Sequence, residues 1–445
     1  MFTEFEFTDY EAHWSKGELV FHYAAFSQNR DKVIRFQEKL ILPSTDFVLN
    51  PKEFDLDEML KCLHLVIGAS YYKFYCTKVI SIPSYALSEK QARFWNTVYE
   101  KGLGEYFYKN NIDYRDLIFF PFSDNYSPNN PQQYNRLSGS LISVGGGKDS
   151  LLSIELIRKS DEPIALLYSH VLHEESVKAA NLPSFKITRE LDQKVFDKEF
   201  LKTVYNGHIP ITGIFSCMSV LFCILYGKKY SIFSNERSSD YGNIDYLGSE
   251  INHQWSKSFE FENLLRAYIK EYISPDVEYF SLLRPLYEIE IIRRFVTFKQ
   301  YLPIFKSCNR NYKLNSTSPI GWCGECPKCA FVFSLMCAFM PVAEVSSIFN
   351  KNLFEDGQLI GLFRELLGLE EAKPFECVGR PEEVQMALYY VFKRNDFRTS
   401  PIISLFEKEI LPTFNRTAIE SDVFSYGDDS NIPEKFKILL KEHDA

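Results

Sequence analysis

The stretch that decides the fold is Leu141-Ile-Ser-Val-Gly-Gly-Gly-Lys-Asp-Ser150, in which an apolar strand runs into three consecutive glycines. A helix-like run over 151–157 follows directly. Glycines adopt positive φ and let backbone N–H groups close around phosphate oxygens, and the start of a helix adds partial positive charge. The stretch therefore predicts an anion-binding turn between a strand and a helix; a tight turn without a ligand is the alternative.

The pattern on either side of this turn predicts an α/β fold. Short apolar runs at 140–144, 164–168 and 230–233 alternate with helical stretches at 151–159, 211–227 and 259–272. Strand and helix alternating at this spacing are typical of βαβ units, which form a parallel sheet with helices on both faces. Ligands of such sheets bind at the carboxyl ends of the strands.

The rest of the chain predicts two further parts. Alternating apolar and polar positions over 5–43 indicate antiparallel strands, and helical spacing over 55–74 and 88–109 brackets a strand at 77–82. The segment 122–133 is rich in Pro, Asn and Ser, which indicates a linker. We therefore expect an N-terminal α+β domain over 1–135, a catalytic domain over 136–345 and a mostly helical region over 346–445.

Composition limits the possible partners. The net charge is -9 and the sequence contains no Lys/Arg run that could follow a phosphate backbone, which disfavours nucleic acid as a partner. The amino terminus lacks the features of a secretory signal, and no apolar run reaches the roughly 18 residues that a membrane span needs. We expect a cytoplasmic enzyme without a membrane segment; the sequence does not indicate its oligomeric state.

Four of the ten cysteines form a spaced cluster. They are Cys308, Cys323, Cys326 and Cys329. Soft ligands at this spacing suit tetrahedral coordination of Zn²⁺, and a closed four-thiolate site predicts a structural metal. Buried thiols without a metal and a redox Cys-x-x-Cys pair are the alternatives. The other six are scattered: Cys62, Cys76, Cys217, Cys223, Cys337 and Cys377.

The glycine turn resembles the Ser-Gly-Gly-x-Asp-Ser signature of the PP-loop ATP pyrophosphatases, which have an adenine nucleotide α-hydrolase-like fold. The first serine of that signature falls on Gly145, and the nearest serine, Ser143, lies two residues earlier. The resemblance implies cleavage of ATP between its α and β phosphates, with Mg²⁺ neutralising the triphosphate. The implied ATP-binding residues are Gly145, Gly146, Gly147, Lys148, Asp149 and Ser150.

A series of motifs in fixed order extends this resemblance to a particular family. The blocks are 145–150, Asn206-Gly-His-Ile-Pro210, Phe233-Ser-Asn-Glu-Arg-Ser238, Asn252-His-Gln-Trp-Ser-Lys257, Leu283-Arg-Pro-Leu286, Ser307-Cys-Asn-Arg310 and 322–329. Further blocks at 63–73, 102–105 and 373–379 extend the likeness over most of the chain. Together they resemble the UDP-N-acetylmuramoyl-L-alanyl-L-glutamate epimerase family.

That resemblance implies conversion of the terminal L-Glu of UDP-MurNAc-L-Ala-L-Glu to D-Glu, with ATP converted to AMP and pyrophosphate. The product is a peptidoglycan precursor. A free carboxylate makes its α-proton very weakly acidic, because the carbanion would place negative charge beside an existing one. Adenylation removes that charge and lets the carbanion delocalise as an enolate, which is the chemical reason for consuming ATP.

An epimerase needs a base near the α-carbon and a proton donor on the opposite face. The candidate catalytic residues are His253, His208, Glu236 and Lys257, together with Asp149 of the glycine turn. The candidates for holding carboxylate or diphosphate groups of the substrate are Asn235, Arg237, Arg284 and Arg310. Spacing does not rank these residues.

Three other functions fit parts of the sequence. In a PP-loop amide ligase or synthetase, an amine rather than water would capture the acyl-adenylate. A PP-loop tRNA-modifying enzyme conflicts with the acidic charge balance. A nucleotide-binding or zinc-stabilised interaction protein would lack turnover altogether.

Overall fold

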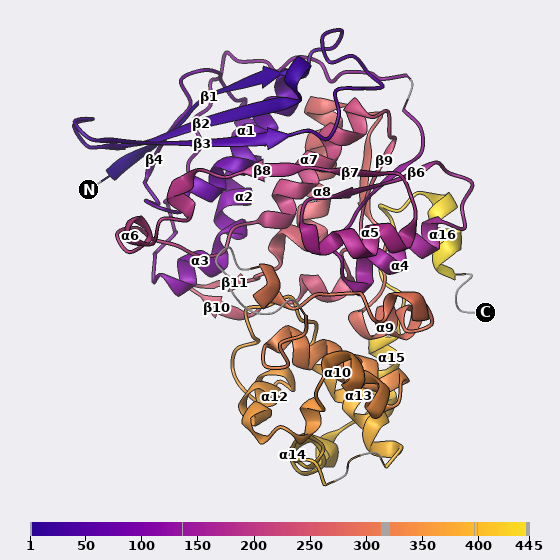
Figure 1. Ribbon diagram of the computed structural model, residues 1–445. Helices are drawn as coiled ribbons and strands as arrows, with labels where there is room; N and C mark the ends of the chain where they lie inside the picture. The colour runs from indigo at the N-terminus through magenta and orange to yellow at the C-terminus, as the bar shows by residue number, and fades with distance from the viewer. Residues whose placement is uncertain (1, 136, 313–320, 396, 398, 442–445) are drawn as a thin grey trace.

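Two five-stranded sheets, a two-stranded hairpin and a helical region make up the computed structural model, which describes residues 2–135, 137–312, 321–395, 397 and 399–441 (Figure 1). The N-terminal sheet has the strand order β4-β1-β2-β3-β8. Its strands are β1 (Phe2–His13), β2 (Glu18–Ser27), β3 (Val33–Ile41), β4 (Val79–Ser81) and β8 (Thr188–Glu190). The antiparallel strands predicted over 5–43 are confirmed, and β4 adds to the edge of β1 in parallel.

The second sheet is fully parallel, as the alternating pattern predicted, with the order β12-β9-β5-β6-β7. Its strands are β5 (Ser140–Ser143), β6 (Ile164–Tyr168), β7 (Ser184–Lys186), β9 (Tyr230–Phe233) and β12 (Glu278–Ser281). The chain builds one half outward from β5 through β6 to β7, then returns to β5 and builds the other half through β9 to β12. The order therefore reverses between β5 and β9, and the crevice at such a reversal is where open α/β sheets bind ligands.

Helices cover both faces of the parallel sheet. Leu141 of β5 packs in the core with α1 (Asp57–Tyr72) and α7 (Ile211–Leu225), whereas the next residue, Ile142, packs with α4 (Lys148–Ile157) and α9 (Glu288–Phe295). Successive side chains of a strand point to opposite faces, so each face has its own apolar core. The prediction of an α/β fold with helices on both faces of a parallel sheet is confirmed.

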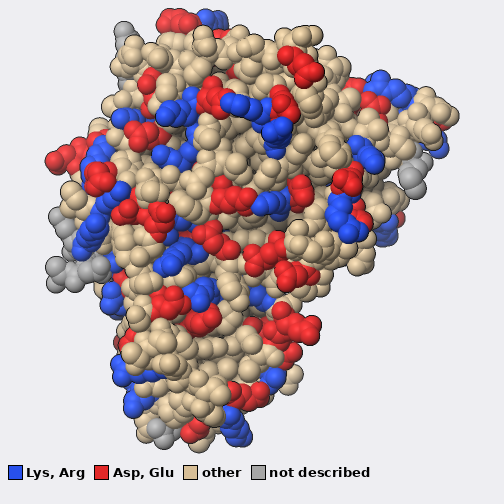
Figure 2. Space-filling model, turned by 180° about the vertical axis from the view of Figure 1, so that it is seen from behind, with Lys and Arg blue, Asp and Glu red and all other residues tan. Residues whose placement is uncertain are grey.

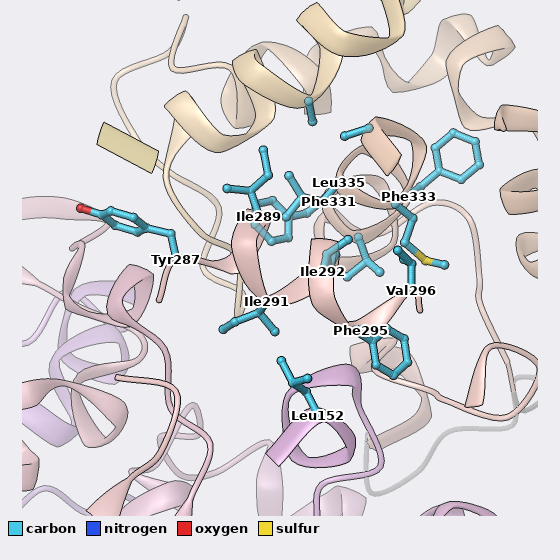
Figure 3. Close-up of a cluster of buried hydrophobic side chains, with 14 of the residues drawn as sticks. Leu152, Tyr287, Ile289, Ile291, Ile292, Phe295, Val296, Phe331, Phe333 and Leu335 are labelled. Atoms are coloured by element: carbon cyan, nitrogen blue, oxygen red, sulfur yellow. The ribbon is translucent and has the colours of Figure 1, made fainter. Parts of the chain in front are cut away.

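The core on the α4 side also anchors the helical region. In Figure 3, α9 lies between α4 and α10 (Pro327–Phe339): Leu152 of α4 approaches from one side and Phe331 of α10 from the other. All three helices are apolar where they meet, and removal of that area from water stabilises the junction. α9 thereby connects the parallel sheet to the orange and yellow helices of Figure 1.

The remaining helices agree largely with the predicted pattern. The stretch predicted as one helix over 88–109 is two, because the chain turns at Leu103. These two helices are α2 (Glu89–Gly102) and α3 (Gly104–Lys109). Three further helices of this part of the chain are α5 (Glu174–Ala180), α6 (Lys198–Leu201) and α8 (Phe259–Tyr268). The strands β10 (Ile244–Tyr246) and β11 (Ser249–Ile251) form a hairpin. The predicted helical C-terminal region contains α11 (Val342–Phe349), α12 (Ile360–Leu366), α13 (Pro381–Lys393), α14 (Pro401–Leu405), α15 (Arg416–Val423) and α16 (Glu434–Lys441).

The last described helix returns to the parallel sheet, where the Phe436 ring of α16 packs edge-on against Tyr230 of β9 and at a tilt against Phe280 of β12. None of the helices in the described ranges has the length and apolar character of a membrane span. On the face seen in Figure 2, Lys and Arg lie among Asp and Glu, without a continuous basic stripe.

A buried ion pair holds β8 to β3 within the N-terminal sheet. Glu38 of β3 is fully buried, and the Arg189 guanidinium of β8 donates to both of its carboxylate oxygens at 2.7 and 3.1 Å. The Tyr71 hydroxyl donates to the same carboxylate at 2.8 Å. β8 follows β7 of the parallel sheet in the chain yet pairs with the N-terminal sheet, and side chains of both sheets lie in one hydrophobic core. The domain boundaries at 135 and 345 stay predictions.

Replacing Arg189 by Ala should lower the free energy of unfolding by about 3–5 kcal/mol, because it leaves the Glu38 carboxylate buried without its cation. The control is Arg93→Ala, which removes an exposed partner of Glu89 and should change stability by less than about 0.5 kcal/mol. Thermal or urea unfolding measures both. Equal stability of the two variants would contradict the structural role of the buried pair.

Candidate active site

A cavity of about 290 Å³ opens at the carboxyl ends of β5 and β9, where the strand order reverses. The glycine turn and the residues after β9 form its walls, and parts of the chain more than 200 residues apart meet there. Its polar and charged lining includes Ser143, Asp149, Ser150, His173, Asn235, Glu236, Lys257, Ser307, Lys328 and Cys377. The position agrees with the expectation that a parallel sheet binds its ligand at this edge.

The glycine turn is shaped by close contacts with its neighbours. Gly146 has φ +70°, and a Cβ there would lie 3.0 Å from the His173 ring. Gly147 caps the start of α4, and a Cβ on it would lie 3.4 Å from Ser307 Cβ. Around Gly145 a Cβ would meet nothing within 4 Å, so this side of the turn is open. The turn thus combines the start of a helix with free space, as a phosphate-binding turn requires.

Two hydroxyl groups beside the turn lack hydrogen-bond partners. The Oγ atoms of Ser143 and Ser307 are buried, line the cavity and have no partner among the described residues. Buried polar groups are nearly always hydrogen-bonded, and an exception points to a ligand or ion. These donors fit an anion seated on the turn. From the sequence, Ser143 is notable only as the serine nearest to Gly145, and Ser307 is not among the predicted ligand-binding residues.

A line of buried charges runs below the turn. Lys148 is ion-paired with Asp149 and Glu288, and the Lys328 ammonium lies 3.4 Å from the other oxygen of Glu288. Burial opposes the charged form of Glu288, but Lys148 and Lys328 lower its pKa to about 2. Lys148 is 1% exposed, so its side chain faces this network and not the cavity. Its predicted role in ATP binding stays a prediction.

Glu236 and Lys257, both predicted catalytic residues, line the cavity together. Burial raises the pKa of Glu236 to about 7, against the lowering effect of Lys257. Burial alone would lower the pKa of Lys257, but the charges of Cys377, Glu236 and Asp149 raise it. A carboxyl group that titrates near neutral pH beside a cation is suited to accept or donate a proton.

The predicted substrate-binding residues separate into two groups. Asn235 lines the cavity and donates to Ser281 Oγ at 3.0 Å. The three arginines do not line it. The Arg284 guanidinium is buried against Glu262 and donates to the backbone carbonyls of Glu236 and Lys257 at 3.0 and 2.6 Å, so it holds these catalytic candidates in place.

The other two arginines have partners elsewhere. Arg237 donates to Ser425 Oγ at 2.9 Å and lies over the Tyr287 ring. Arg310 pairs with Glu325 at 2.7 Å next to the cysteine cluster. The structure therefore gives no support to substrate contacts by these arginines, and those roles stay predictions.

The two candidate histidines come together behind the cavity wall. The rings of His208 and His253 lie 4.3 Å apart, and Nδ1 of His253 is hydrogen-bonded to the Glu105 carboxylate of α3. Burial lowers the pKa of His208 well below its usual value. Burial also opposes the charge of His253, but hydrogen bonds to Cys377 and Glu105 raise its pKa to about 9. Neither histidine lines the cavity.

Cys377, counted in sequence among the scattered cysteines, is the residue that stands between His253 and the cavity. Burial opposes its thiolate, but the Lys257 ammonium and the hydrogen bond from His253 lower the pKa of Cys377 to about 5. The signal that could have found it is the block 373–379, which belongs to the family pattern although it lies far from the catalytic motifs.

The four clustered cysteines converge as their spacing predicted. Their sulfur atoms lie within 4.8 Å of one another, and none of the four forms a disulfide. The Sγ–Sγ distances are 3.8 Å for Cys308–Cys326, 3.7 Å for Cys323–Cys329 and 3.5 Å for Cys326–Cys329. A tetrahedral site with metal–sulfur bonds of about 2.3 Å has edges of about 3.8 Å, so the group can hold a metal ion.

The fold and site define a doubly wound α/β protein with a glycine turn at the start of a helix and a group of titratable side chains at its strand-order reversal. The sequence matches the MurL N-terminal domain over residues 1–282 and the MurL C-terminal domain over residues 304–421. The chain belongs to the MurL family, as its motifs predicted.

Curated relatives carry the name UDP-N-acetyl-alpha-D-muramoyl-L-alanyl-L-glutamate epimerase. The protein from Xanthomonas oryzae pv. oryzae is 35% identical over 87% of this chain and 86% of its own length. Those from Micromonospora sp. and Salinispora tropica are 35% identical over 98% of this chain, and over 98% and 95% of their own lengths. Epimerases are isomerases, and this chain is an enzyme of that class.

Replacing Ser307 by Ala should weaken binding of inorganic pyrophosphate about tenfold or more without lowering the melting temperature, because the hydroxyl has no partner in the described structure and a hydrogen bond to an anion contributes about 1.5–3 kcal/mol. The control is Ser219→Ala, whose buried hydroxyl is bonded to Ser231 at 2.8 Å. That variant should lose stability and keep its pyrophosphate affinity. Calorimetry measures the binding; an unchanged affinity in Ser307→Ala would show that no anion meets this hydroxyl.

Proposed function

We propose that this chain converts the terminal L-Glu of UDP-MurNAc-L-Ala-L-Glu to D-Glu in an ATP-dependent reaction that releases AMP and pyrophosphate. The observation that carries the proposal is that the glycine turn, Glu236 and Lys257 line the same cavity. Membership of the MurL family supplies the substrate, because the relatives are named for it. The product would enter peptidoglycan precursor synthesis.

The turn fits the phosphates of ATP in the manner of a PP-loop. Gly145 leaves open space, the start of α4 directs backbone N–H groups at the cavity, and Ser143 and Ser307 offer unused hydroxyls. Ser143 can thereby replace the hydroxyl that the usual signature places at the position of Gly145. Mg²⁺ accompanies ATP as part of the substrate and neutralises the triphosphate. Asp149 and Ser150 line the same cavity.

Three steps complete the reaction. A carboxylate oxygen of the substrate glutamate attacks the α-phosphorus of ATP, and the bond to pyrophosphate breaks. The α-proton of the resulting acyl-adenylate is then removed on one face, and a proton returns to the enolate on the other face. Water finally cleaves the mixed anhydride, which gives the free carboxylate and AMP.

The structure favours some candidates for proton transfer over others. Glu236 and Lys257 line the cavity, so they can reach a bound substrate. His253 and His208 lie behind the wall, where they can act only through a neighbouring group. Asn235 offers an amide beside Glu236 for a polar group of the substrate.

An amide ligase acting through the same acyl-adenylate on another glutamate-terminated peptide or small carboxylate is the alternative. It would use the same turn, but an amine would take the place of water. The mass of the product distinguishes the two, since an epimerase leaves the mass of the substrate unchanged.

The cysteine cluster is proposed to hold one structural Zn²⁺ per chain. Its four thiols have tetrahedral spacing, and a closed set of four thiolates leaves no position for a substrate. The cluster includes Cys308, which follows Ser307 in the chain, and Cys329 of α10, the helix that also carries Lys328 of the buried charge network. The metal would therefore support the cavity from outside.

Replacing Cys326 by Ser should release the metal and lower the melting temperature, because a thiolate site contributes folding free energy. Metal analysis of the purified protein should find about one zinc per chain. The control is Cys223→Ser, a buried thiol outside the cluster, which should retain the zinc. A metal-free wild-type protein of normal stability would contradict the assignment.

The reaction itself is tested by incubating the protein with UDP-MurNAc-L-Ala-L-Glu, ATP and Mg²⁺ in D₂O. We expect D-Glu with one deuterium at Cα, unchanged connectivity, and equal amounts of AMP and pyrophosphate. Without ATP no deuterium should enter, because the unactivated carboxylate leaves the α-proton too weakly acidic. Mass spectrometry measures the deuterium at Cα, and chiral amino-acid analysis measures the configuration of the glutamate.

The matched variants are Asp149→Asn and Ser150→Ala, which should stop pyrophosphate release and deuterium entry together. Ser150→Ala should retain the melting temperature, whereas Asp149→Asn removes one partner of the buried Lys148 and should lower it. Deuterium entry without ATP would contradict the proposed mechanism. AMP formed while the glutamate stays fully L and unlabelled would favour the ligase.

A further inference from the structure

A segment of the helical region, 373–379, contributes Cys377 to the cavity wall. It lies between α12 and α13, and its backbone is bound by one residue just before the hairpin and one in the loop after it. Asn243 Nδ2 donates to Pro374 O at 2.7 Å, and Gln254 Nε2 donates to Val378 O at 3.2 Å. These bonds fix Cys377 at the cavity wall, beside Glu236 and Lys257.

The groups behind Cys377 form a relay of hydrogen bonds. Glu105 engages Nδ1 of His253, which leaves the other ring nitrogen for the bond to the Cys377 sulfur. The backbone N–H of His253 donates to Asn243 Oδ1 at 2.8 Å, so the amide that binds the 373–379 segment also holds the histidine. Thiol, imidazole and carboxylate thus stand in series, in the arrangement that activates nucleophilic or basic cysteines.

Several charges face the Cys377 sulfur. Lys257, His253 and Lys328 lower the pKa of its thiol to about 5 despite burial, and Glu376 and Lys373 also lie within range of its charge. The pKa of His253 is raised to about 9. Between these values the thiolate and the imidazolium coexist. Cys76, which lies outside the cavity, shows the opposite effect, because burial raises the pKa of its thiol to about 11.

We propose that Cys377 is a catalytic residue that exchanges the α-proton on one face of the substrate glutamate, and that His253 and Glu105 are its positioning residues. The proposal rests on the epimerisation proposed above. The thiolate takes the proton from Cα and becomes a thiol, and the enolate receives a proton from a second group on the opposite face. Both groups then exchange protons with water. The second group is expected to be Glu236 or Lys257, which line the same cavity.

The Cys377→Ala and Cys377→Ser variants test this role through separate partial reactions. Both should release pyrophosphate in the presence of substrate and ATP within a few-fold of the wild-type rate, because adenylation does not use the thiol. Epimerisation should fall by about 10²–10⁴-fold. In D₂O, exchange at Cα should be lost for the epimer whose proton faces Cys377 and persist for the other.

The control variant is Cys76→Ser, which should epimerise normally. Normal epimerisation by Cys377→Ala, or a thioester between Cys377 and the glutamate carbonyl, would overturn the proton-transfer role. Failure of the wild-type protein to form AMP would instead contradict the proposed function.

A second measurement uses the wild-type chain and does not depend on the folding of a Cys377 variant. Iodoacetamide should alkylate Cys377 faster than Cys76 at pH 7, because the thiolate is the reacting form. The pKa of Cys377 is lowered to about 5 and the thiolate is present above it, so the alkylation rate of Cys377 should fall only as the pH drops below about 5. In His253→Gln the midpoint of the pH dependence of Cys377 alkylation should move to higher pH. A purely structural role of the histidine would not produce this shift. Peptide mass spectrometry reads the modification, and a midpoint near that of an ordinary thiol in the wild type would overturn the proposal.

Discussion

The structure depends on a set of charges that are buried and therefore must be paired. Lys148 and Glu288 are each 1% exposed and come from the glycine turn and from α9, and Lys328 adds a second cation from α10. Removing one partner of such a pair leaves a charge without water, which costs about 3–5 kcal/mol. The network therefore joins the parallel sheet to the helical region at the point where the cavity is formed.

This constraint explains why the site draws on the whole chain. The parallel sheet supplies the turn and the edge at the strand-order reversal, where α/β proteins bind ligands. The N-terminal part supplies Glu105, the loop after the hairpin supplies His253 and Lys257, and the helical region supplies Cys377. Charges of both signs are held beside one another, and several of them shift the pKa of their neighbours.

The arginines show how residue type can mislead. Arg284 has the chemistry to bind a carboxylate, and it stands in one of the motifs that carry the family resemblance. In the structure its guanidinium donates to the backbone carbonyls of Glu236 and Lys257 and pairs with Glu262. It stabilises the loops that carry the catalytic candidates. His253 is a similar case, because it does not line the cavity. Its hydrogen-bond partner Cys377 lines the cavity instead.

The sequence by itself determined the parallel sheet, its glycine turn, the clustered cysteines and the family, because each depends on periodicity or on spacing within short segments. Its motifs also contain Glu236 and Lys257, which line the cavity, while their catalytic roles stay predictions. Only the tertiary structure decided which polar side chains face the cavity. Residues 105, 253 and 377 meet through long-range packing and through bonds such as Asn243 to Pro374, and no local pattern records contacts between such distant segments.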